Sequence, residues 1–154
     1  DDKHIYVSNF DNYLYCLSRV DGQIIWRIEE GGAFPVTVEG QTLYYATSNG
    51  KVKAIQRTTG DIIWSKSSPK GIATQPVLFQ GNLIYGESDG ALKVVEAKTG
   101  RFITQYETGR GVNSAPTVDP VSGHVYVMTN EANLFSLGFR WANDSEFRPA
   151  RVRF

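Results

Sequence analysis

The stretch that decides the fold is Leu43–Trp64, LYYATSNGKVKAIQRTTGDIIW. It holds three short runs with high strand propensity, separated by the turn pairs Asn49-Gly50 and Thr59-Gly60. Glycine in such turns tolerates the positive φ that tight hairpins require. The stretch therefore predicts antiparallel strands at 43–47, 52–55 and 62–66, preceded by a strand at 35–38.

The same pattern recurs along the chain with a period of about 40 residues. The segment 5–17 returns at 43–55, 83–95 and 125–137. Two further sets of residues recur with the same period: the glycines Gly22, Gly60 and Gly100, and the prolines Pro35, Pro76 and Pro116. Four antiparallel strands per unit of this length, with no sustained helical period, are the signature of a β-propeller blade. We expect an all-β propeller of WD40-like blades, with about four blades present.

The repeat also divides the chain. It predicts a partial blade at 1–34, blades at 35–74 and 75–115, and a partial blade at 116–139. The tail 140–154 ends in alternating apolar and basic residues, a pattern that suits the missing fourth strand of the last blade.

Four blades of this size would make an open arc with an apolar face exposed at each end. Three arrangements follow: half of a longer seven- or eight-bladed ring, two copies paired into a ring, or four blades closing alone. A start inside a blade favours the first arrangement.

Composition excludes several classes of function. The 154 residues carry 16 basic and 16 acidic side chains, and a formal charge of zero argues against a nucleic-acid partner. The sequence contains no run of about 18 apolar residues, so it predicts no membrane-spanning helix. It also contains no charged start followed by an apolar segment, so we expect no signal peptide in this chain. A single cysteine offers neither a disulfide nor a zinc site.

The residues that commonly carry chemistry do not converge in this pattern. His4 and His124 share one repeat position on separate blades, and Cys16 occupies a core position that is small in the other copies. The carboxylates at one hairpin corner also belong to separate repeats, at Asp11, Asp89 and Glu131. We expect no catalytic residue, cofactor or metal site.

The repeat DGxLxxL followed by TGxxxW resembles the PQQ-like (quinoprotein-type) propeller blade. It is written here as Asn49-Gly50-Lys51-Val52 with Thr59-Gly60 and Trp64, and as Asp89-Gly90-Ala91-Leu92 with Thr99-Gly100. Within that superfamily the segment 75–104 is similar to a late blade of the BamB family of outer-membrane protein assembly factors. The resemblance covers about residues 4–139.

The resemblance implies a non-catalytic scaffold in outer-membrane β-barrel assembly, periplasmic and outer-membrane associated as a lipoprotein. Its partners would be other subunits of the assembly machinery, the missing half of the propeller, or a second copy. In the family a tryptophan at the end of the fourth strand packs between blades. This implies structural roles for Trp26 and Trp64, which follow turn glycines, and structural roles are also expected for Gly22, Gly60 and Gly100.

Two alternatives remain. Quinoprotein dehydrogenases share the blade, but they use a calcium site, a catalytic aspartate and often an adjacent Cys-Cys pair, and this chain has no such pair. A periplasmic or extracellular recognition module could also use these blades.

A protein-binding face is expected where the connections between blades and the hairpins between the second and third strands emerge together. Aromatic and arginine side chains are enriched at protein interfaces. On this basis the sequence predicts a protein-binding set with exposed aromatics at Phe10 and Phe34, together with Lys70, Arg110 and Asn113.

Overall fold

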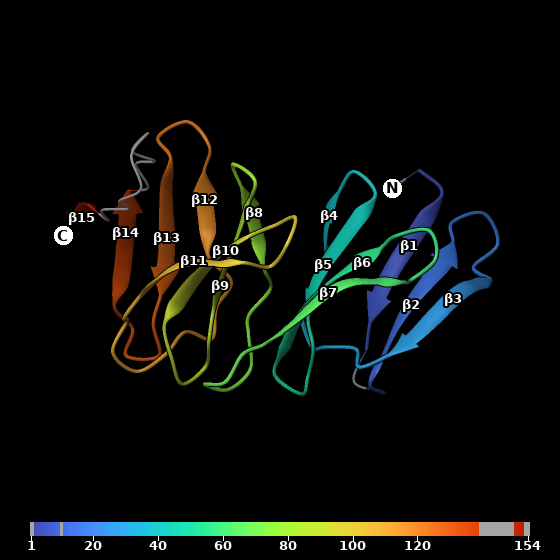
Figure 1. Ribbon diagram of the computed structural model, residues 1–154, viewed down its shortest axis with the longest axis horizontal. Coiled ribbons are helices and arrows are strands. Elements are labelled where there is room, and N and C mark those ends of the chain that lie inside the picture. The colour runs from blue at the N-terminus through green and yellow to red at the C-terminus, as the bar shows by residue number, and fades with distance from the viewer. Residues whose placement is uncertain (1, 10, 139–149, 153–154) are drawn as a thin grey trace.

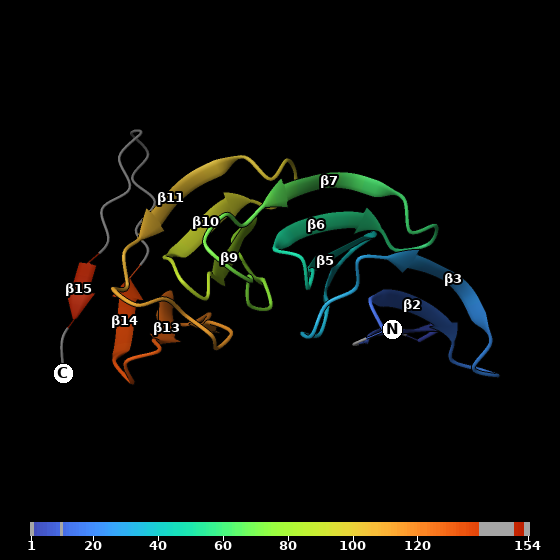
Figure 2. The same cartoon turned by 90° about the horizontal axis from the view of Figure 1, so that it is seen from below.

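The structure is a computed structural model that describes residues 2–9 and 11–138, and residues 150–152 through their backbone. The described residues form strands joined by turns, without a helix, in four antiparallel sheets. Figure 1 shows the sheets side by side along the molecule, and Figure 2 shows that they follow an arc. The all-β propeller-type fold expected from the repeat is confirmed. In the part of the chain that the structure describes, no helix is long and apolar enough to cross a membrane.

Each sheet is built from strands that are consecutive in the chain. The first sheet contains β1 (His4–Ser8), β2 (Tyr13–Ser18) and β3 (Ile24–Glu29). The second contains β4 (Thr37–Glu39), β5 (Thr42–Ala46), β6 (Lys51–Gln56) and β7 (Ile62–Ser67). The third contains β8 (Val77–Phe79), β9 (Asn82–Gly86), β10 (Leu92–Glu96) and β11 (Phe102–Tyr106). The fourth contains β12 (Thr117–Asp119), β13 (His124–Met128), β14 (Leu134–Gly138) and β15 (Ala150–Val152). The last strands of the first three sheets, β3, β7 and β11, lie on the convex side of the arc (Figure 2).

The second sheet shows how closely turn chemistry sets the strands. Its hairpin turns at Gly50, where φ is 76°, and β5, β6 and β7 begin within one residue of the predicted positions. The first strand differs, because β4 begins at Thr37 instead of Pro35. Proline has no N–H to give to a strand ladder, so pairing with β5 starts only beyond it.

The fourth sheet is completed from the far end of the chain. Strand β15 pairs antiparallel with β14, and Val152 lies opposite Ser136. The rest of the tail, 139–149 and 153–154, falls outside the described residues.

The core lies between the sheets. We call the face that a sheet turns toward the next sheet its back, and the face toward the preceding sheet its front. Three apolar clusters join each back to the following front, and the cluster between the first two sheets contains Leu14 from one and Leu43, Tyr45 and Ile55 from the other. Neighbouring residues in a strand point to opposite faces, and each middle sheet has a neighbour on both faces. Strands β5 and β9 of these sheets are therefore buried along nearly their whole length.

Two tryptophans cross these interfaces, and they lie within their strands, Trp26 in β3 and Trp64 in β7, not at the strand ends that the sequence predicts. Trp26 Nε1 donates to the Arg57 carbonyl at 3.1 Å, and Trp64 Nε1 donates to the Ala97 carbonyl at 2.9 Å. Gly100 lies under the Trp64 ring, where an added Cβ would come within 2.8 Å of the ring carbons. The indole N–H of Trp64 is therefore hydrogen-bonded, and its ring fills a space that is open because residue 100 has no side chain.

Candidate protein-binding face

The connections between sheets and the hairpins of the following sheets lie at the same end of the strands (Figure 1), and we call this side of the molecule the loop face. It comprises the connections 30–36, 68–76 and 107–116 and the hairpins 47–50, 87–90 and 129–133. The backbone ties each connection to the next hairpin in the same way. Ser48 N donates to the Gly31 carbonyl at 2.9 Å, Ser88 N to Ile72 at 3.0 Å, and Asn130 N to Gly111 at 3.1 Å. Side chains on these segments are therefore held on a fixed frame.

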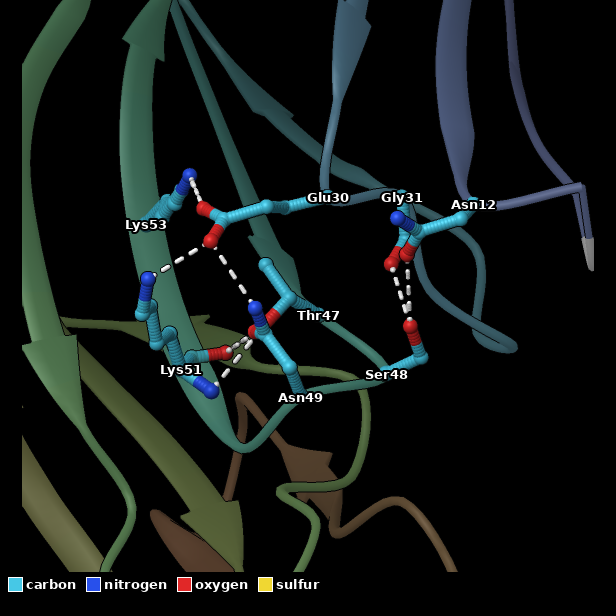
Figure 3. A network of polar contacts seen from close by, with 8 residues as sticks. All are labelled: Asn12, Glu30, Gly31, Thr47, Ser48, Asn49, Lys51 and Lys53. Carbon is cyan, nitrogen blue, oxygen red and sulfur yellow. Dashed lines mark hydrogen bonds and ion pairs between the residues drawn. The ribbon is translucent and has the colours of Figure 1, made fainter.

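Between the first two sheets this frame is reinforced by a polar network around Glu30 (Figure 3). Glu30 follows β3 with a φ of 64°, and its carboxylate accepts hydrogen bonds from Lys51 at 2.6 Å, from Asn49 at 2.8 Å, and from Lys53. These donors, led by Lys51, lower the pKa of Glu30 to about 2. Glu30 is thus an anion at all ordinary pH values.

The hairpin of the second sheet is held by neutral contacts beside this ion cluster. Ser48 Oγ donates to Asn12 Oδ1 at 3.0 Å, which links two successive hairpins (Figure 3). Thr47 Oγ1 contacts Asn49 Oδ1 at 2.6 Å and receives the Lys51 N–H at 2.9 Å. The amide group of Asn49 is therefore fixed at both ends, and its nitrogen points at Glu30.

The interface between the second and third sheets has a lysine at the same repeat position, but the carboxylate that pairs with it comes from a different loop. Lys93 occupies the repeat position of Lys53, and its Nζ lies 2.8 Å from Glu87 Oε1. Glu87 comes from the hairpin after β9, is fully buried, and also accepts from Ser68 Oγ at 2.7 Å. Both lysines thus neutralise a carboxylate at the rim of the core, as buried charges require.

Two buried tyrosines line the same interfaces. Burial raises the pKa of Tyr45, and it raises the pKa of Tyr85 to about 12, with the nearby Glu87 carboxylate adding to the effect. Both phenols stay protonated and act as packing groups of the loop-face rim.

The predicted binding residues fall into three classes. Lys70, Arg110 and Asn113 are exposed on the loop face. Arg110 Nε lies 2.9 Å from Glu131 Oε1, so the connection and the hairpin of the last interface present an ion pair to solvent. Phe10 lies outside the described residues.

Phe34 requires a correction. The sequence predicts an exposed aromatic, whereas the structure places Phe34 half-buried. Its connection is held against the first hairpin, because Gly31 N donates to the Asn12 carbonyl and Gly32 N donates to Ser8 Oγ.

The Glu30 network and its counterpart at Glu87 were not anticipated from the sequence. A signal existed, because Lys53 and Lys93 share a repeat position at which the outer copies carry Tyr15 and Phe135. A lysine at an otherwise apolar position of a central strand indicates a buried partner. Its carboxylate could not be named, because Glu30 and Glu87 come from different loops.

Within residues 2–9 and 11–138, no three His, Cys, Asp or Glu side chains come together as a potential metal site. Asp11 accepts the Tyr15 hydroxyl at 2.7 Å, and burial raises the pKa of the Cys16 thiol. His4 and His124 begin strands in the first and last sheets.

The family model described as outer membrane protein assembly factor BamB matches residues 1–146. The chain belongs to the BamB family. BamB of Escherichia coli strain K12 is 30% identical over 81 residues, which are 52% of this chain and 21% of that protein. The chain thus spans only part of the length of the BamB proteins that it matches.

Similarity also extends beyond BamB. The lanthanide-dependent methanol dehydrogenase of Methylacidiphilum fumariolicum is 30% identical over 69 residues, 43% of this chain and 11% of that enzyme. Among solved structures, BamB from Moraxella catarrhalis superposes with a TM-score of 0.74 at 18% identity, covering 87% of this chain and 42% of that one. The last likeness supports the fold.

Proposed function

We propose that this chain is a non-catalytic, BamB-like scaffold that binds proteins of outer-membrane β-barrel assembly through its loop face, as a periplasmic, outer-membrane-associated lipoprotein. The observation that carries this proposal is the loop face itself. Three connections and three hairpins are joined by backbone hydrogen bonds into one rigid surface. A pre-formed surface loses little conformational entropy when a partner binds.

The charges of the loop face suit a protein partner. Glu30 and Glu87 are neutralised within the network, whereas the Lys70 cation, the Arg110–Glu131 ion pair and the Asn113 amide are exposed. Rim charges of this kind steer association and fix the register of a complex. Membership of the BamB family supports barrel-assembly proteins as the partner class.

Binding is tested with the chain immobilised and detergent-solubilised outer-membrane barrel-assembly proteins in solution, measured by interferometry. We expect saturable binding that weakens as salt rises, because exposed charges are screened. Absence of binding at all protein concentrations, with a folded chain, would contradict the proposal.

The likeness to methanol dehydrogenase makes a quinoprotein blade segment the second candidate. The described residues do not fit a quinone–metal centre, because Asp11, Asp89 and Glu131 stand on separate hairpins and Glu131 is paired with Arg110. Titration with PQQ and calcium, followed by quinone absorbance and calorimetry, separates the two functions. Stoichiometric binding of both would favour the enzyme.

A further inference from the structure

A pocket lies between the second and third sheets, at the end of the strands opposite the loop face. One wall is the back of the second sheet, at Tyr44, Ala54 and Trp64. The other wall belongs to turns of the third sheet, at Gly81 and Ala97. The pocket has a volume of about 340 Å³. This volume is near the lower end of the range for ligand-binding pockets, so it suits a small ligand or one long side chain.

The repeat explains why the pocket is present at this interface. Arg57 and Ala97 are equivalent, because the carbonyl of each accepts the indole N–H of the preceding sheet. The Gln41 carbonyl accepts from Arg57 N at 2.9 Å. The Gly81 carbonyl accepts from Ala97 N at 2.9 Å, so these two residues are equivalent as well. The third sheet thus has alanine and glycine where the second sheet has two long side chains, and the space beside Trp64 is left open.

At the interface between the first two sheets, an arginine takes this position. The Nε atom of Arg57 is buried. Burial raises the pKa of the Tyr6 hydroxyl, and the nearby Arg57 cation acts in the opposite direction. Tyr6 lies 6.1 Å from the ring of Trp26, as its counterpart Tyr44 lies 6.2 Å from the ring of Trp64. The chain therefore holds a guanidinium group of its own beside the aromatic pair whose counterpart lines the pocket.

The mouth of the pocket carries a charge of the sign that a cation requires. Glu39 lines the pocket and is exposed. Burial raises the pKa of Tyr44, and the Glu39 carboxylate adds to this rise, so the two groups are close. Lys98 also lines the pocket, but on the third sheet, where its charge acts on the Glu96 carboxylate. The faces of aromatic rings attract cations, and a carboxylate can accept two parallel hydrogen bonds from one guanidinium group.

We propose that this pocket binds the arginine side chain of a partner protein segment, with its stem against Trp64 and its guanidinium group between Tyr44 and Glu39. A bound arginine enters from outside and takes the place that Arg57 takes from inside at the preceding interface. A planar guanidinium group stacks on aromatic rings better than an ammonium group does. The pocket and the loop face lie at opposite ends of the strands, so this site adds to the proposed function and does not depend on it.

Titration of the isotope-labelled chain with N-acetyl-arginine methylamide, followed by proton–nitrogen NMR, tests this. The indole N–H of Trp64 and the amide N–H groups of Gly81 and Ala97 should shift and saturate. The indole N–H of Trp26 should keep its position, because an arginine of the chain already lies there. The uncharged isostere N-acetyl-citrulline methylamide should shift none of these signals at the same concentrations. Equal shifts with the two probes, or no shift with either, would overturn the proposal.

Variants locate the binding. Ala97→Arg copies the first interface and should abolish the shift of the Trp64 indole, with a cooperative melt showing that the variant is folded. Glu39→Gln, at an exposed position, should weaken binding of the arginine probe about fivefold, because a charged hydrogen bond becomes a neutral one. This variant decides alone if Ala97→Arg does not fold. Glu29→Gln is the matched control, an exposed carboxylate at the other end of the strands, and should bind like wild type.

Unchanged binding in Glu39→Gln or in folded Ala97→Arg would contradict the proposal, as would an equal loss in Glu29→Gln. None of these results bears on partner binding by the loop face.

Discussion

At the scale of single residues, the glycine beneath each tryptophan connects the sequence repeat to the packing between sheets. Gly60 and Gly100 have positive φ, and both lie against an indole of the preceding sheet. Glycine is therefore required at each of these positions for two reasons: the backbone has a positive φ, and a side chain would contact the indole. Gly22 shares the conformation, with φ 73°, but not the packing.

This difference predicts unequal costs for the same substitution. Gly22→Ala should cost about 1 kcal/mol, because only the left-handed backbone is strained. Gly100→Ala should cost about 2 kcal/mol more, since its Cβ would overlap the Trp64 ring. Urea denaturation measures both free energies of unfolding. Equal losses in the two variants would contradict the packing role of Gly100.

Glu30 predicts a dependence of stability on pH. Its pKa is about 2 in the folded chain against an ordinary 4.5, so the folded state favours the anion. The contribution is complete above pH 4.5 and is lost as the pH falls toward 2. Glu30→Gln should lower the free energy of unfolding by about 2 kcal/mol at pH 7, because the buried Lys53 loses its anionic partner.

The measurement is the free energy of unfolding of wild type and variant between pH 7 and pH 2. The gap between the two proteins should shrink as the solution is acidified. Glu39→Gln, at an exposed carboxylate, is the control and should change little. A gap that stays constant with pH would show that the ion cluster does not hold the loop face.

At the scale of elements, hairpin chemistry and strand periodicity made the sheets predictable. The turn pair Asn49-Gly50 and the alternation of residues through β5 and β6 define pairing and register together. The start of β4 differed because proline removes a ladder donor. The polar network was beyond prediction, because it depends on which loops meet across two sheets.

The central strands should carry most of the stability. Leu92 of β10 is 1% exposed within the cluster between the third and fourth sheets. Leu92→Ala should cost about 3 kcal/mol through lost burial and a residual cavity. Ile62→Ala at the convex edge should change stability by no more than about 0.5 kcal/mol. Urea denaturation of the two variants tests this ranking, and a reversed order would contradict the packing described.

At the scale of the whole molecule, the repeat predicted an arc with open ends, and the exposed fractions at Ile5 and Leu134 agree with it. The sheet stacking separates two kinds of surface. The front of the first sheet and the back of the fourth sheet are apolar like the internal interfaces, whereas the loop face is polar and is stabilised by ion pairs. The partner binding that we propose belongs to this polar loop face.

The placement of binding on the loop face is the central claim, and one comparison of dissociation constants tests it most directly. The triple variant Lys70→Ala/Arg110→Ala/Asn113→Ala removes exposed groups of the loop face. The control Lys98→Ala/Arg101→Ala/Gln41→Ala removes two charges and an amide from exposed turns at the opposite ends of the strands. Binding of barrel-assembly proteins should weaken at least about tenfold in the first variant, about 1.4 kcal/mol, and stay unchanged in the second. A first variant that binds like wild type, or a second that loses binding, would contradict the account.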